Sequence, residues 1–156
     1  MTRSQLIAEL KKHFDIRELV CQHTFTAFGE KSWQFIDFQQ LQALYILRFE
    51  IFPEGMIVNN YSYPHSGKTY TQRGVRCNIC QICKDKTLAG SIYMSAHANG
   101  AGDDFDVPGL TAEESRQIII MNADKFPFKI RLESKVNWVH VDVYDDPLST
   151  RKVTLF

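Results

Sequence analysis

The 156-residue chain lacks the features that would place it in several large classes of protein. It has no excess of either charge, because 18 basic and 18 acidic residues cancel and are interspersed. Net charge therefore gives no reason to expect a nucleic acid or a membrane surface as a partner. No apolar run approaches the roughly 18 residues that a membrane span requires. A hydrophobic content of 44% is still sufficient for one domain with a sizeable core.

Residues 1–12 lack the apolar stretch of a secretory signal. The localisation is left open: we expect a chain that is cytoplasmic until it is released or exported, and four cysteines that are free thiols rather than disulfides. Three of them form a C-x-x-C-x-x-C run at Cys77, Cys80 and Cys83, and Cys21 and His23 are available to complete a metal site. The same run is also compatible with a helical turn that buries small thiols.

The residues best suited to chemistry begin with the stretch 95–106, Ser-Ala-His-Ala-Asn-Gly-Ala-Gly-Asp-Asp-Phe-Asp. Gly100 and Gly102 permit backbone conformations that other residues resist, so the chain can turn back between His97 and Asp104. Beyond the turn, the pattern predicts an extended segment whose side chains alternate between two faces.

A second stretch, residues 138–143, reads Trp-Val-His-Val-Asp-Val. The period of a strand places Trp138, His140 and Asp142 on one face and three valines on the other. This pattern predicts a strand with an apolar back and a functional front.

Together the two stretches offer His97, Asp104 and His140 as three ligands for one metal ion. Two imidazoles and a carboxylate, with a fourth position left for water, are typical of a catalytic zinc site rather than a closed structural one. The alternative is that both histidines are ordinary hydrogen-bonded residues and that Asp104 caps a turn.

The order Ser-x-His-x-x-Gly-x-small-x-Asp, followed by an aromatic-x-His-x-Asp strand, resembles the zinc D-Ala-D-Ala peptidases. The related VanX-type dipeptidases, phage endolysins and hedgehog domain share it. Ser95, His97, Gly100, Gly102 and Asp104 match the first motif, with Gly102 where alanine is usual. The resemblance implies a hedgehog-like or DD-peptidase-like fold and zinc bound by the three ligands named above.

The activity implied is hydrolysis of a peptide bond in bacterial cell-wall peptides, of the D-Ala-D-Ala carboxypeptidase or L-Ala-D-Glu endopeptidase type. The expected partner is a peptidoglycan stem peptide, which a chain without a signal would reach through cell lysis, a phage-type lysis system or a longer precursor. The family also implies an arginine that holds a substrate carboxylate, and here Arg76 or Arg73 is available, with Ser95 nearby in the motif. The alternative is two solvated arginines on a loop.

The sequence departs from the family at the general base. Relatives supply it three or two residues before the last ligand, where this chain has Asn137 and Trp138. The role would pass to Asp142, Glu133, Asp106 or a residue from a loop, and Asp142 is equally suited to steady a ligand. Otherwise the chain is a zinc-containing module that binds peptidoglycan or protein without fast turnover, or a cysteine-metal domain in which the histidines are incidental.

Periodicity predicts an α+β fold, with a small antiparallel sheet that carries the ligands and helices packed on one of its faces. Residues 1–55 form the helical part and residues 56–156 the part with the sheet and the metal site. Helices are expected at 4–12, 33–52 and 112–124, and strands at 56–63, 104–107, 130–133, 137–143 and 152–155. Ser4 is expected to cap the first helix, and Thr111 with Glu114 to form a capping box at the last.

Overall fold

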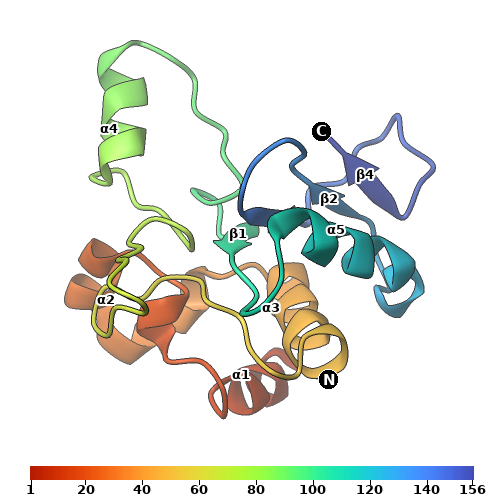
Figure 1. Cartoon of the computed structure of the whole chain (residues 1–156). Coiled ribbons are helices and arrows are strands. Elements are labelled where there is room, and N and C mark those ends of the chain that lie inside the picture. The colour runs from red at the N-terminus through yellow and green to blue at the C-terminus, as the bar shows by residue number, and fades with distance from the viewer.

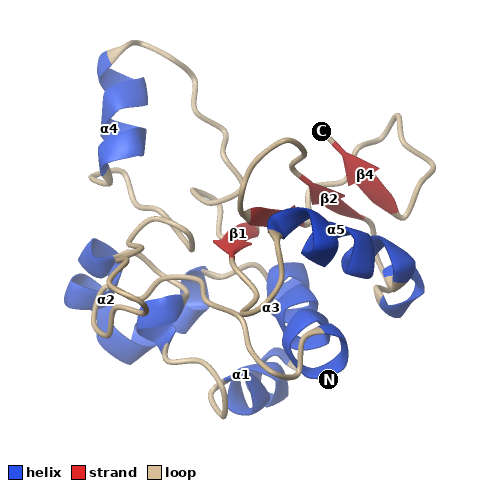
Figure 2. Ribbon diagram, in the orientation of Figure 1, coloured by secondary structure: helices blue, strands red, loops and turns tan.

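The computed structural model describes residues 1–156 and arranges helices around a small sheet (Figures 1 and 2). The helices are α1 (Arg3–Leu10), α2 (Gln22–Phe28), α3 (Phe38–Tyr45), α4 (Gln81–Leu88) and α5 (Ala112–Met121). The 3-10 and π-helical segments are η1 (Ile16–Glu18), η2 (Gly29–Phe35), η3 (Ile46–Ile51) and η4 (Ala123–Lys125). The strands are β1 (Gly102–Phe105), β2 (Ile130–Leu132), β3 (Val139–Asp142) and β4 (Val153–Leu155). None of the helices combines the length and the apolar character needed to span a membrane.

The four strands lie in the order β1-β3-β2-β4. The β1/β3 and β3/β2 pairs are antiparallel, whereas β2 and β4 are parallel. The sheet is therefore mixed, and the expectation of an all-antiparallel sheet is wrong at the β4 edge. The α+β class is as expected.

One continuous apolar core joins the sheet to the helices. Phe105 of β1, Val139 and Val141 of β3 and Ile130 of β2 are fully buried in the same cluster as residues of α1, α3 and α5, among them Ile119. The alternation of β3 thus buries its valines in the core and leaves the other face of the strand for polar side chains.

The helix expected over 33–52 is divided by the structure. Asp37 caps a new helix, because its carboxylate accepts hydrogen bonds from the backbone N–H groups of Gln39 and Gln40. The turns before the cap are 3-10 helical, and those after α3 form a π-helix. The apolar residues are spaced as for one continuous helix over 33–52, but the cap at Asp37 ends one helical segment and begins α3.

Residues 56–63 do not form the expected strand and make only one antiparallel bridge, between Ile57 and Asp106. Polar side chains organise this segment instead. Asn59 donates to the Val20 carbonyl and accepts from the Arg73 N–H, so a loop is held by side-chain bonds rather than by a strand ladder.

Of the helix ends expected from the sequence, the start of α5 is as predicted, whereas the start of α1 and the end of α5 lie at other residues. Thr111 and Glu114 form the expected capping box of α5. The cap of α1 is Thr2, paired with Gln5, and the expectation of Ser4 is wrong. The last helix ends at Met121 before a separate turn.

Gly100 makes the turn that brings the first motif back towards β1. Its φ is +67°, and a Cβ at this position would lie 1.9 Å from the Phe35 carbonyl oxygen. The Gly100 carbonyl also accepts a hydrogen bond from the Asp37 N–H at 2.8 Å. The turn is thus packed directly against the junction between η2 and α3.

We predict that Gly100→Ala lowers the free energy of unfolding by roughly 3 kcal/mol or more, because the side chain meets backbone that must move. Gly90 is a matched control, since its φ is +68° and nothing lies within 4 Å of the position that a Cβ would take. Gly90→Ala should cost only the roughly 1–2 kcal/mol of a left-handed alanine. Equal losses in denaturant unfolding of the two variants would contradict the close packing at Gly100.

Candidate functional site

Three chain segments bring the predicted metal ligands together. Asp104 on β1 and His140 on β3 are direct partners in the antiparallel register. His97 lies in the turn before β1, and its carbonyl accepts a hydrogen bond from the Arg76 N–H at 3.1 Å. The alternation of two strands and one glycine turn therefore places all three side chains on the same face of the sheet.

The potential ligand atoms form a small triangle. His97 Nε2 lies 3.2 Å from both Asp104 Oδ1 and His140 Nδ1, and the latter two atoms are 2.7 Å apart. All three residues are buried. These side chains could hold a metal ion, and two imidazole nitrogens with one carboxylate oxygen are a donor set that suits zinc.

Hydrogen bonds on the far side of each ring set the orientation of both histidines. His97 Nδ1 donates to the Gly74 carbonyl at 3.0 Å, which leaves its Nε2 lone pair towards the other ligands. His140 Nε2 lies 3.0 Å from Asp142 Oδ2 and donates to it, so its Nδ1 is the ligand atom. Such partners fix the tautomer and direction of metal-binding imidazoles.

Asp142 is fully occupied by its neighbours. Its two oxygens accept from Arg131 Nε and Nη2, each at 2.8 Å, and Oδ1 also accepts from the Tyr144 N–H. Burial alone would raise the pKa of Asp142, but the hydrogen bonds from His140 and Arg131 outweigh it and lower the pKa. These contacts suit a role for Asp142 in holding His140 in place. They leave the Asp142 carboxylate poorly placed to take a proton from water.

The electrostatics of the site favour a positive charge at its centre. Burial alone would lower the pKa of His140, but hydrogen bonds with Asp104 and Asp142 raise it to about 9. Burial would raise the pKa of Asp104, and the two histidines hold it below its usual range instead. Burial dominates at His97 and lowers its pKa. A proton and a metal cation would thus compete for the same nitrogen of His140.

The ligands open onto a cavity of about 400 Å³. Its walls include the three ligands and the following residues: Arg76, Tyr93, Ser95, Arg131, Glu133, Trp138, Asp142 and Phe156. Glu133 follows β2, and its N–H bonds the His140 carbonyl at 3.4 Å. Because Arg131 pairs with Asp142 in the register, Glu133 is level with His140 and shares its face.

The two arginines predicted for substrate binding have different surroundings. Arg76 lines the cavity and contacts the Gln72 carbonyl through Nε, the Tyr93 hydroxyl through Nη1 and Asp104 Oδ2 through Nη2. Arg73 is outside the cavity lining, where it pairs with Asp106 and stacks on Tyr70. Of the two, Arg76 is therefore the one at the site.

Asn137, at the family's base position, and Asp106, a candidate for the base, lie elsewhere. Asn137 and Asp106 line a different cavity, of about 550 Å³, together with Arg116. Asp106 shares the strand period of Asp104 but is engaged by Arg73 at 2.8 Å. The candidates that line the ligand cavity are thus Glu133 and Asp142.

Sequence reasoning missed Arg131, Tyr93 and Phe156. Arg131 could have been found, because it stands two residues before Glu133 and so shares its face in the predicted strand. The hydroxyl of Tyr93 accepts a hydrogen bond from the Arg76 side chain. The ring of Phe156 contacts the His140 ring, with 5.8 Å between the two ring centroids. Neither contact has a local signal in the sequence.

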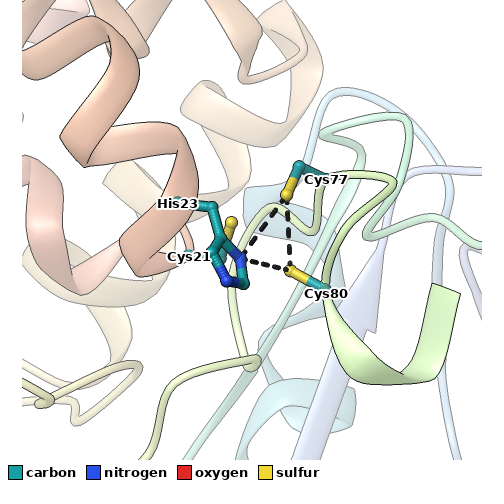
Figure 3. A group of neighbouring side chains, drawn as sticks. All are labelled: Cys21, His23, Cys77 and Cys80. Atoms are coloured by element: carbon teal, nitrogen blue, oxygen red, sulfur yellow. Dashed lines mark hydrogen bonds between the residues drawn. The ribbon is translucent and has the colours of Figure 1, made fainter. Parts of the chain in front are cut away.

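A second group of possible ligands lies away from this cavity. Cys21, His23, Cys77 and Cys80 offer four ligand atoms within 4.8 Å of one another (Figure 3). Cys83, the third cysteine of the run, packs beside them but is outside the group.

Comparison of the chain with protein-family models, curated proteins and solved structures gave no match. The site is therefore interpreted from its own residues.

We predict that His97→Ala binds one zinc ion fewer per chain than the wild type, because the change removes one of three protein ligands. His65→Ala is the control, since His65 is exposed and lies outside both ligand groups. It should keep the wild-type zinc content in elemental analysis. Unchanged zinc in His97→Ala would refute the assignment of this group as a metal centre.

Proposed function

We propose that the chain is a zinc-dependent peptidase that hydrolyses a peptide bond in bacterial cell-wall peptides, of D-Ala-D-Ala carboxypeptidase or L-Ala-D-Glu endopeptidase type. The observation that carries the proposal is the convergence of His97, Asp104 and His140 on the wall of an open cavity. Three protein ligands leave a coordination position free, as catalytic zinc sites do. Zinc held there would supply Lewis-acid chemistry, which activates a water and polarises the scissile carbonyl.

The substrate class comes from a different argument. The spacing from Ser95 to Asp104 and the strand around His140 resemble the cell-wall peptidases, and the cavity supplies groups that such a peptide needs. Support for zinc comes from the donor set and its geometry, whereas support for peptidoglycan comes from the motif. The two parts of the proposal can therefore fail separately.

Glu133 is the residue we assign as the general base. It lines the cavity, and the β2/β3 register puts it next to His140 on the ligand face. No other side chain is hydrogen-bonded to its carboxylate, whereas the Asp142 carboxylate accepts four hydrogen bonds, two from Arg131, one from His140 and one from the Tyr144 N–H. A base must be able to turn towards the proton that it removes.

Arg76 is the residue we assign to the substrate carboxylate. A guanidinium has five N–H groups, and three are used by Gln72, Tyr93 and Asp104. One N–H therefore remains on each terminal nitrogen, which is the fork that binds a carboxylate through two bonds. The contact with Asp104 places this fork beside the metal ligands.

Glu133→Gln should lower peptide hydrolysis by ~10²- to 10⁴-fold with zinc content unchanged, because it removes the proton acceptor but no ligand. Asp142→Asn should instead lower zinc occupancy, with a loss of ~10- to 100-fold in metal affinity that added zinc largely restores. Asn137→Ala is the control and should match the wild type in both assays.

The opposite pattern would reverse the two roles. If Asp142→Asn is inactive with full zinc and Glu133→Gln retains activity, then Asp142 is the base and Glu133 is not. Rates and zinc content must be measured on the same preparations, because only the pair of values separates a base from a ligand support.

A zinc-containing module that binds peptidoglycan or protein without turnover is the second candidate. It is favoured by Asn137, which occupies the usual position of the base and lines a separate cavity. Such a module is expected to bind peptidoglycan fragments and to leave their peptide bonds uncleaved.

The wild type with full zinc should release new termini from whole peptidoglycan, which contains both bonds in question. Mass spectrometry of the products then identifies whether D-Ala-D-Ala or L-Ala-D-Glu is cut. If zinc-loaded protein cleaves neither bond, the peptidase proposal fails for cell-wall substrates, and retention on peptidoglycan would support the binding module.

A further inference from the structure

The second ligand group joins two parts of the chain that are far apart in sequence. Cys21 is the N-cap residue of α2 and His23 lies in its first turn, whereas Cys77 and Cys80 form a tight turn just before α4. The turn is closed by a hydrogen bond from the Cys80 N–H to the Cys77 carbonyl at 3.1 Å. A C-x-H pair thus meets a C-x-x-C pair, and two pairs of ligands at short spacing are typical of structural zinc sites.

The distances between the ligand atoms fit a tetrahedron. Cys77 Sγ and Cys80 Sγ are 3.7 Å apart, and His23 Nδ1 lies 3.6 Å from the first and 3.7 Å from the second (Figure 3). Zn–S bonds of about 2.3 Å and Zn–N bonds of about 2.0–2.1 Å give tetrahedral edges of roughly 3.8 Å for two sulfurs and roughly 3.5–3.6 Å for sulfur and nitrogen. The three edges are therefore those expected around one common ion.

Cys21 supplies the fourth corner. Its Sγ lies within 4.8 Å of the other three ligand atoms and 3.1 Å from the Thr24 hydroxyl. A hydroxyl at this position can donate to a metal-bound thiolate, which is how neighbouring groups commonly support such ligands.

Neither a disulfide nor a set of hydrogen-bonded thiols accounts for the geometry of this group. A disulfide requires sulfurs about 2.0 Å apart, well short of the 3.7 Å between Cys77 and Cys80, and all four cysteines of the chain are free. Pairs of hydrogen-bonded thiols need no fourth member, and thiols are weak donors. The imidazole of His23, an exposed residue, faces the sulfurs of Cys77 and Cys80. A disulfide or a pair of hydrogen-bonded thiols would not require this imidazole.

We propose that Cys21, His23, Cys77 and Cys80 bind a second zinc ion in a closed, four-ligand structural site. With no coordination position left for water, this ion has no catalytic role. Its role is to fix the turn before α4 to the start of α2.

The surroundings of α4 show why such a link is needed. In Figure 1 the helix stands away from the rest of the molecule, and Cys83 is its only buried residue. Leu88 is 77% exposed, and Ile92, in the segment after the helix, is 92% exposed. The apolar core therefore does little to hold this arm, defined as residues 77–94.

Both ends of the arm lie next to residues of the first site. Cys77 directly follows Arg76, and Tyr93 at the other end accepts a hydrogen bond from Arg76 Nη1 at 2.9 Å. Beside the second site, the Cys21 N–H donates to the Val75 carbonyl at 2.9 Å. A zinc ion at the second site would thus hold Arg76 in position without touching it.

The test is zinc stoichiometry and cobalt absorption of the full chain. The wild type should bind two zinc ions and Cys80→Ser one. Cys83→Ser should bind two, because this buried cysteine of the same cluster is not a ligand. After exchange with cobalt, thiolate-to-metal charge-transfer absorption should be present in the wild type and in His97→Ala and absent in Cys80→Ser. The first site contains no sulfur, so this absorption reports on the second site whatever happens to the peptidase proposal.

His23 provides variants that leave the buried residues intact. His23→Ala should lower zinc affinity at the second site, and His23→Cys should restore it with a fourth thiolate. Loss of this zinc should also increase hydrogen exchange in residues 76–95 but not in α1 or α3. Wild-type protein without thiolate-to-cobalt absorption, or with a disulfide among Cys21, Cys77 and Cys80, would overturn the proposal.

Discussion

The contact of Asp142 with Arg131 and His140 is the interaction on which the candidate active site depends. The two-pronged bond from Arg131 fixes the carboxylate, and the carboxylate then holds His140 Nε2. Only with that nitrogen held does Nδ1 face Asp104 and His97. Gly102, the strand partner of Asp142, has no side chain, and a Cβ there would lie 2.9 Å from the Asp142 Cβ. The glycine thus leaves room for the buried carboxylate.

The site can be described as two rows of residues across the antiparallel part of the sheet. One row runs from Asp104 through His140 to Glu133 and contains two candidate metal ligands and the proposed base. The next row runs from Gly102 through Asp142 to Arg131 and supports the first. Residues two apart on a strand share a face, so each strand contributes one member to each row. The valines between them point into the core, which fixes the register because a slip of one residue would bury the charged side chains.

The sequence allowed the ligand face to be predicted because strand alternation is a local property. It placed Asp104, His140 and Asp142 correctly, and the glycines indicated the turn after His97. The proposal of Glu133 rather than Asp142 as the base needed the register of β2 against β3, and the meeting of Cys21 with Cys80 needed the packing of two distant segments. Local signals also misled where side chains compete with the backbone: Asp37 divides a helix whose apolar stripe is continuous, and Asn59 holds a loop whose composition favours a strand.

The charges of the two ligand sets explain why one would be catalytic and the other structural. A divalent zinc ion bound by one carboxylate and two neutral imidazoles keeps a net positive charge, so it remains an effective Lewis acid. Three thiolates and an imidazole more than neutralise the same ion and complete its tetrahedron, which leaves it neither charge nor space to act on a substrate. The open set also lies beside Arg76 and Arg131, which balance the buried carboxylates of Asp104 and Asp142. The positive charge of the metal would then be free to interact with the substrate and with Glu133. Glu133 is the one carboxylate on the cavity wall that no arginine contacts.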